Sequence, residues 1–263
     1  LLKNEAETLP LNQDLDSIAV IGPNADNKDI ILGNYHGTPS DYVTPLRGIR
    51  EKVSDDTRVY YTEGCDLTST DTTHWGDDAT KGFSEAISMA ERSEAVVMCM
   101  GLSPALEGEE GAVAASDGGG DRTSLDLPGM QQELLQAVVD TGKPVILVLF
   151  NGSSVTINWS QENIPAILEA WYPGEKGGTA IADILFGDCN PSGRMPLTFV
   201  KSLDQVPPFT DYSMEGRTYR YLEDEPLYPF GYGLSYTEFE YSQLELDSEK
   251  VKAGETIAIT VKV

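Results

Sequence analysis

The sequence predicts an α/β protein, in which a mostly parallel sheet is covered by helices on both faces, followed by a short antiparallel β segment. Short runs rich in β-branched residues recur between segments that carry apolar residues at helical spacing. One such run, 145–150, is apolar at every position, as expected for a parallel strand buried on both faces. Strict alternation over 256–263 predicts the antiparallel part.

The expected elements alternate along the chain, which is the order that builds an α/β sandwich. The predicted strands of the parallel sheet are 17–22, 57–62, 95–101, 144–151 and 164–172. The predicted helices between them are 83–92, 129–139 and 178–186.

The pattern divides the chain into three parts. We assign 1–215 to the α/β sandwich domain, 216–240 to a connecting segment, and 241–263 to the start of a β-sandwich. Two or three strands are too few to build both sheets of a sandwich, so we expect that last domain to be incomplete in this sequence.

Composition limits the classes of partner. The formal net charge of -25 excludes nucleic-acid binding, because neutralising phosphates needs clustered lysines and arginines. The three cysteines and two histidines have no metal-ligand spacing, and no run of about 18 apolar residues offers a membrane span. We expect no metal, no organic cofactor and no membrane partner, and the sequence assigns no compartment.

A long acidic loop follows the strand that ends at Gly101. It carries Glu107, Glu109 and Glu110, and it ends near Arg122. A loop of more than about 15 residues in a compact domain is uncommon unless it is functional or disordered. On the residues alone, a solvated acidic loop is the alternative to a catalytic one. Arg122 is expected to form an ion pair or a clamp at the base of the loop, with steering of a substrate as the alternative.

Several motifs resemble glycoside hydrolase family 3. GLSPALEGEE at 101–110 and GDRTSLDLPG at 120–129 look like the family's acid/base loop. The sequence AWYPGEKGGTAIADILFGDCNPSGRMPLTF at 170–199 is similar to its C-terminal-domain signature. PLYPFGYGLSYT at 226–237 resembles the segment before a fibronectin type III-like module, with Tyr232 where many members have His.

This resemblance implies a retaining glycosidase that removes terminal β-linked xylose or glucose from an oligosaccharide. It implies that the nucleophile, an Asp, lies on an N-terminal (β/α)8 barrel domain of the same protein, so we expect the isolated chain to be inactive. It points to Glu109 as the acid/base, with Glu107 as the competitor, and to Tyr35 as an aromatic substrate-binding platform.

Two questions of function stay open at the level of the sequence. The form Gly33-Asn34-Tyr35 favours a xylosidase over a glucosidase. The alternative to an enzyme is a non-catalytic carbohydrate-binding or structural module, against which the cluster of three glutamates in the acidic loop counts.

Overall fold

The computed structural model describes residues 1–70, 79–107 and 122–263. Its main sheet has six strands in the order β1-β6-β5-β4-β2-β3, and neighbouring strands are parallel except for the antiparallel pair β1 and β6. The fold class predicted from the sequence is confirmed. The strands are β1 (Lys3–Asn4), β2 (Ser17–Ile21), β3 (Arg58–Thr62), β4 (Ala95–Gly101), β5 (Val145–Phe150) and β6 (Ala166–Glu169).

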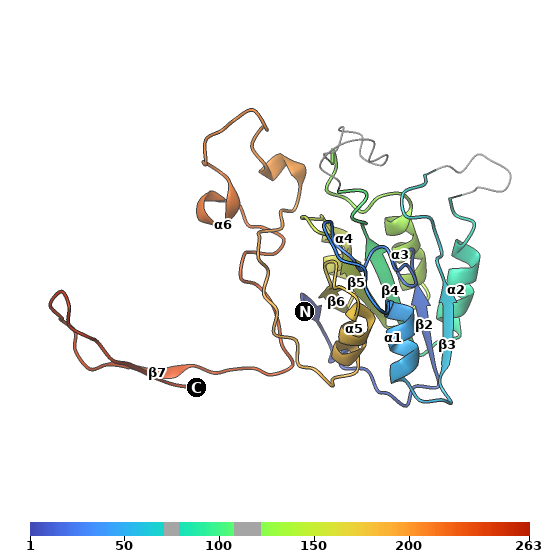
Figure 1. The fold of residues 1–263 in the computed structure, drawn as a ribbon, viewed down its shortest axis with the longest axis horizontal. Coiled ribbons are helices and arrows are strands. Elements are labelled where there is room, and N and C mark those ends of the chain that lie inside the picture. Colours follow the sequence, from blue (N-terminus) through green and yellow to red (C-terminus); the bar gives the residue numbers. More distant parts are fainter. Residues whose placement is uncertain (71–78, 108–121) are drawn as a thin grey trace.

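Helices cover both faces of this sheet (Figure 1). On one side α1 (Pro45–Lys52) packs against α5 (Gly177–Leu185), and on the other α2 (Phe83–Glu91) packs against α3 (Gln131–Val139). The period of two along β2 divides its side chains between two cores: Ala19 and Ile21 enter the α2–α3 core, and Ile18 and Val20 enter the α1–α5 core. The short helix α4 (Asn158–Asn163) precedes β6.

Helix α1 was not predicted. Its sequence carries a glycine at its centre, which weakens a helical pattern. The helix is nevertheless well started, because the Thr44 side chain accepts a hydrogen bond from the Arg47 N–H at 3.3 Å and Pro45 occupies the first turn. Gly48 is required by packing: a Cβ there would lie 2.1 Å from the carbonyl oxygen of Gly178 on α5.

The strand predicted to end at Tyr172 is shorter in the structure. β6 ends at Glu169, and Trp171 then adopts a positive φ of 54°. A left-handed residue cannot continue a strand, and it is rare for a side chain as large as tryptophan. The chain therefore turns sharply here, before α5 begins.

The N-terminal residues join the edge of the sheet and meet the C-terminal part of the domain. Leu2 donates its N–H to Ile167 at 2.8 Å, which continues the pairing of β1 with β6. The Leu234 N–H donates to the Leu1 carbonyl at 2.8 Å, and the Tyr232 hydroxyl donates to the Leu2 carbonyl at 2.9 Å.

The C-terminal part contains a 3-10 turn (Leu203–Gln205), the single-turn helix α6 (Thr218–Tyr221), and the strands β7 (Ser242–Leu246) and β8 (Ile259–Lys262). The two strands pair antiparallel, as the alternation predicted. They form an arm that leaves the body of the domain, with every residue of both strands exposed (Figure 1). The division at 215 and 240, and the fibronectin-like nature of the last part, stay predictions.

Among the described residues, none of the helices has both the length and the apolar character needed to cross a bilayer.

Candidate functional site

Three loops meet at one end of the sheet. They follow β4, β5 and β6, which are adjacent in the sheet and parallel to one another. The carboxyl ends of such strands carry the loops that form ligand sites in α/β proteins. At the end of β4, Gly101 approaches β5 so closely that a Cβ would lie 2.1 Å from the Phe150 carbonyl oxygen. This close contact fixes the start of the acidic loop beside the end of β5.

The carboxylate of Glu107, on the loop after β4, is held by donors from the other two loops. Its Oε2 accepts the Gly152 N–H at 2.7 Å and also the hydroxyl of Tyr172. Its Oε1 accepts the hydroxyl of Ser153. The side chain is only 11% exposed. Both oxygens of Glu107 therefore have donors, and the last described residue before the gap at 108–121 is anchored to the loops after β5 and β6.

Arg122, the first described residue after 108–121, contacts the same loop after β5 that anchors Glu107. Its Nη1 donates to the Ser153 hydroxyl at 2.9 Å and to the Ser154 carbonyl at 3.0 Å, and it lies 3.9 Å from the Glu107 Oε1. Burial lowers the pKa of the Arg122 guanidinium, and the nearby charge of Glu107 opposes that shift. The expectation that Arg122 clamps the base of the loop is confirmed, with Ser153 joining the two ends.

Tyr172 lies in the turn after β6, and its hydroxyl is one of the donors to Glu107. Burial, and then its hydrogen bond to Glu107, raise the pKa of the Tyr172 phenol well above its ordinary value. The phenol therefore stays protonated at physiological pH and acts as a donor. The positive φ of Trp171 is what brings this hydroxyl to Glu107, and the Trp171 ring is fixed by an edge-on contact with Phe199 at 5.9 Å between centroids.

A second carboxyl lies next to this network. The Oε1 of Glu169 accepts the Trp171 N–H at 3.1 Å, and its Oε2 accepts the side-chain amide of the buried Asn151 at 3.4 Å. Burial raises the pKa of Glu169 to about 8, against the opposing effect of these two hydrogen bonds. At neutral pH the group is therefore mostly uncharged, and it supports the turn that carries Tyr172.

Glu107, Arg122, Ser153 and Tyr172 line a cavity of about 760 Å³. Its described lining residues are Asn34, Glu107, Arg122, Leu125, Gly152, Ser153, Tyr172 and Phe209. A cavity of this size is in the range of sites that bind small molecules. No group of three or more His, Cys, Asp or Glu residues among the described positions has a metal-binding arrangement.

The residues predicted from the sequence are placed differently. Glu107 lies in the cavity, whereas Glu109 falls outside the described residues. Tyr35 is 99% exposed, has a positive φ of 60°, and does not line the cavity, although its neighbour Asn34 does.

Sequence reasoning named neither Ser153 nor Tyr172 as a site residue. Both lie far from Glu107 in the chain, at separations of 46 and 65 residues. The signal that could have identified them is their position just after strands β5 and β6, at the same end of the sheet as the acidic loop.

Comparison with known proteins gives this geometry a context. The model of the "Glycosyl hydrolase family 3 C-terminal domain" matches residues 1–236. A β-xylosidase of Formosa agariphila is 42% identical over all of this chain and 36% of its own length. A periplasmic β-glucosidase of Salmonella typhimurium is 35% identical over 100% of this chain and 36% of its own.

A solved structure is similar to this chain as well. It is that of a β-glucosidase from Erythrobacter marinus, with a TM-score of 0.80 and 36% sequence identity, over 99% of this chain and 36% of that one. The chain thus spans about a third of the length of such relatives. With the family model covering all of the α/β sandwich, the chain belongs to glycoside hydrolase family 3, as a C-terminal domain.

Proposed function

We propose that this chain supplies the acid/base half of a retaining β-glycosidase active site. The other half, an Asp nucleophile, is supplied by an N-terminal (β/α)8 barrel domain of the same protein. Such an enzyme needs two carboxyl groups about 5 Å apart, one to attack the anomeric carbon and one to protonate the departing oxygen. The cavity at the ends of β4, β5 and β6 is where the second group would act.

The observation that carries the proposal is the anchoring of Glu107. Its oxygens accept hydrogen bonds from a backbone N–H, a serine hydroxyl and a tyrosine hydroxyl. A general acid needs a proton on an oxygen that faces the leaving group. Both oxygens of Glu107 already accept hydrogen bonds from the protein, so we assign this residue to holding the loop.

Glu109 is then the acid/base. It follows the anchored residue by two positions in the sequence. The clasp of Glu107, Ser153 and Arg122 holds both ends of the segment that carries it. The loop base is therefore fixed at the cavity, as a catalytic group on a loop requires.

The reaction has two steps. In the first, the Asp of the barrel attacks the anomeric carbon while Glu109 gives its proton to the glycosidic oxygen, and the aglycone leaves as an alcohol. In the second, Glu109 takes a proton from water as the water oxygen attacks the same carbon and displaces the Asp. Both steps need no metal and no organic cofactor.

The substrate class is a terminal β-linked xylose or glucose on a short oligosaccharide. The relatives in the comparisons include both β-xylosidases and β-glucosidases. Tyr35 is proposed to offer its exposed ring as a platform for a sugar face near the entrance, since aromatic rings stack on the apolar faces of sugars.

The test uses the intact protein and pairs of aryl β-xylosides and β-glucosides whose leaving groups differ in acidity. Glu109→Gln should lower kcat/KM for a phenyl glycoside by about 10²- to 10⁴-fold, because phenol needs protonation to leave. A 2,4-dinitrophenyl glycoside leaves without protonation, so its glycosylation step should change little. Azide should restore turnover of the 2,4-dinitrophenyl glycoside by Glu109→Gln and yield the β-glycosyl azide.

Glu110→Gln is the matched control, and it should retain nearly full activity on both substrates. If Glu107→Gln rather than Glu109→Gln shows leaving-group dependence and azide rescue, the two roles are reversed. If neither variant does, this chain does not carry the acid/base.

A further inference from the structure

An apolar surface is presented by residues 203–222, here called the strap. The strap lies apart from the helix and sheet layers of the domain (Figure 1). Its large apolar side chains are exposed, with Phe209 at 86% and Tyr212 at 89%. Further exposed members are Leu203, Val206, Met214, Tyr219 and Tyr221. A cluster of this size on one short segment marks an interaction surface.

The strap has a defined conformation without burying these side chains. Arg217 organises it from within: its Nη2 donates to the carbonyls of Pro208 at 2.9 Å and Asp211 at 2.6 Å, and its Nε donates to the Ser213 carbonyl at 3.1 Å. The Tyr219 ring stacks on Phe230 at 4.5 Å between centroids. Polar contacts and one ring pair therefore shape the strap, and its apolar groups remain available.

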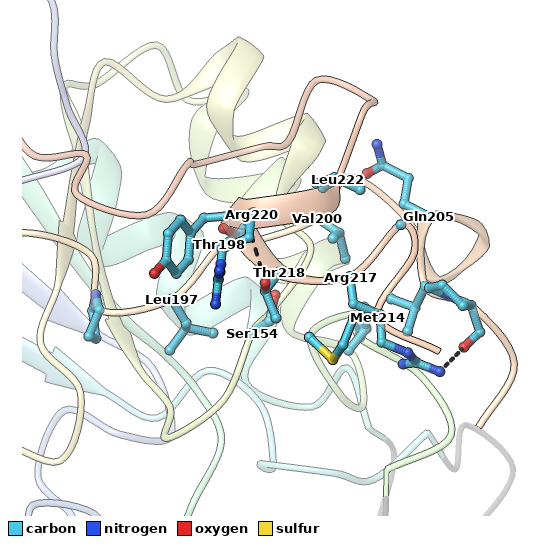
Figure 2. A pocket seen from close by; sticks show the side chains of 16 residues that line it. Ser154, Leu197, Thr198, Val200, Gln205, Met214, Arg217, Thr218, Arg220 and Leu222 are labelled. Atoms are coloured by element: carbon cyan, nitrogen blue, oxygen red, sulfur yellow. Dashed lines mark hydrogen bonds between the residues drawn. The ribbon is translucent and has the colours of Figure 1, made fainter. Parts of the chain in front are cut away.

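Beneath the strap lies an open groove of about 610 Å³ (Figure 2). Its walls come from the strap, from the segment 196–200 that precedes it, and from Leu125 and Ser154. Figure 2 shows Leu197, Val200 and Met214 among the side chains around α6. The lining is mostly apolar carbon, although it includes Arg217 and Arg220. Such a groove suits an apolar side chain or a helix edge of another domain more than a sugar.

The groove adjoins the cavity that contains Glu107. Leu125 lines both, and Phe209 of the strap lines the Glu107 cavity. The strap therefore lies at the carboxyl ends of β4, β5 and β6. The β7–β8 arm leaves the body of the domain elsewhere (Figure 1). A domain that brings a nucleophile to the Glu107 cavity must cover this same face.

We propose that the strap and its groove are the docking surface for the N-terminal domain of the same protein, the domain that carries the nucleophile in the proposed function. The chain spans about a third of the length of its relatives, and a protein of their length has room for a partner domain of sufficient size. Contact between that domain and the strap fixes the distance between the two catalytic carboxyls. The inference rests on the proposed function for its choice of partner.

The test is site-specific photocrosslinking in the intact protein. Met214→p-benzoylphenylalanine places a reactive ketone in the groove, and mass spectrometry identifies the segment to which it links after illumination. We expect cross-links to residues that precede Leu1, at a yield at least tenfold above a control. The control is Arg92→p-benzoylphenylalanine, an exposed position that precedes β4 and lies at the opposite end of the sheet.

Cross-links from position 214 to residues beyond Val263, or between two copies of the protein, would overturn the proposal, and so would none above the control. Hydrolysis of aryl β-xyloside and β-glucoside by the intact protein is measured in parallel. Cross-links to the N-terminal domain without hydrolysis would support the docking surface and sink the proposed activity. Hydrolysis without such cross-links would support the proposed activity and overturn the docking surface.

Discussion

The hydroxyl of Tyr172, just beyond β6, donates a hydrogen bond to the carboxylate of Glu107. Glu107 stands 65 residues earlier in the sequence, on the loop after β4. The contact depends on a left-handed Trp171 and on the edge-on packing of the Trp171 ring against Phe199. Trp171, whose ring packs against the core, thus positions Tyr172, whose hydroxyl reaches the site.

Removal of that hydroxyl tests the anchor. Tyr172→Phe should lower the free energy of unfolding by about 1 to 2 kcal/mol, because a buried carboxylate loses one of its donors. In the intact enzyme kcat/KM should fall about tenfold with little change in KM, since a loosened loop misplaces the acid/base. Urea unfolding and steady-state kinetics measure the two effects. An unchanged kcat/KM would mean that Glu107 does not position the loop.

Two adjacent serines provide a matched pair. Ser153 joins Glu107 to Arg122, whereas the buried Ser154 hydroxyl has no hydrogen-bond partner within the described part of the chain. Ser153→Ala should cost about 1 to 3 kcal/mol of stability because two charged groups lose a partner. Ser154→Ala should stay within about 0.5 kcal/mol of the parent. Equal losses in urea unfolding would show that the serine bridge contributes nothing.

Glu169 predicts a pH dependence of stability. Its pKa of about 8 in the folded state lies above the ordinary value of a glutamate, so the folded protein binds a proton that the unfolded chain has released. Stability from this group is therefore lost as pH rises from about 5 to 8, by at most about 1.4 kcal/mol per pH unit. Glu169→Gln stays neutral, so it should gain stability relative to the parent across that window.

Urea unfolding at pH 5, 6.5 and 8 measures this difference, with Glu162→Gln at an exposed position as the control. Parallel pH profiles of the parent and Glu169→Gln would show that Glu169 is ionised in the folded protein.

The contact between α1 and α5 predicts a steric effect. A Cβ at Gly178 would lie 2.0 Å from the Thr44 carbonyl oxygen, so the two helices would have to separate. Gly178→Ala should lower stability by about 2 to 3 kcal/mol. At Gly193 no atom lies within 4 Å of an added Cβ, and Gly193→Ala should change stability by less than about 0.5 kcal/mol. Thermal unfolding distinguishes the two, and similar values would place the helices further apart than the structure does.

The sequence predicted all five strands of the parallel part because each is a short run rich in β-branched, aromatic or other apolar residues. In β2, β4 and β5 every residue is buried, as expected for parallel strands covered on both faces. It missed α1, where Gly48 interrupts the pattern, and β1, which is only two residues long. Pairing at a sheet edge and close helix contact are tertiary effects, and local composition does not encode them.

The site was predicted in part. The glutamates and Arg122 stand together in a recognisable motif, so sequence found them. Ser153 and Tyr172 join them only when β4, β5 and β6 become neighbours. The turn at Trp171 has no local signal, because a tryptophan is an unfavourable residue for positive φ and is held there by its surroundings.

The hydrogen bonds that join Leu1 to Leu234, and Leu2 to Tyr232, have a mechanical consequence. The chain enters and leaves the α/β sandwich at one place on the edge of the sheet. Tension between the segments attached at the two ends would load those bonds and the short β1 first. Strands β2 to β5 would lie outside the path of the force, so the loops after β4 and β5 that meet at Glu107 would keep their geometry while attached segments move.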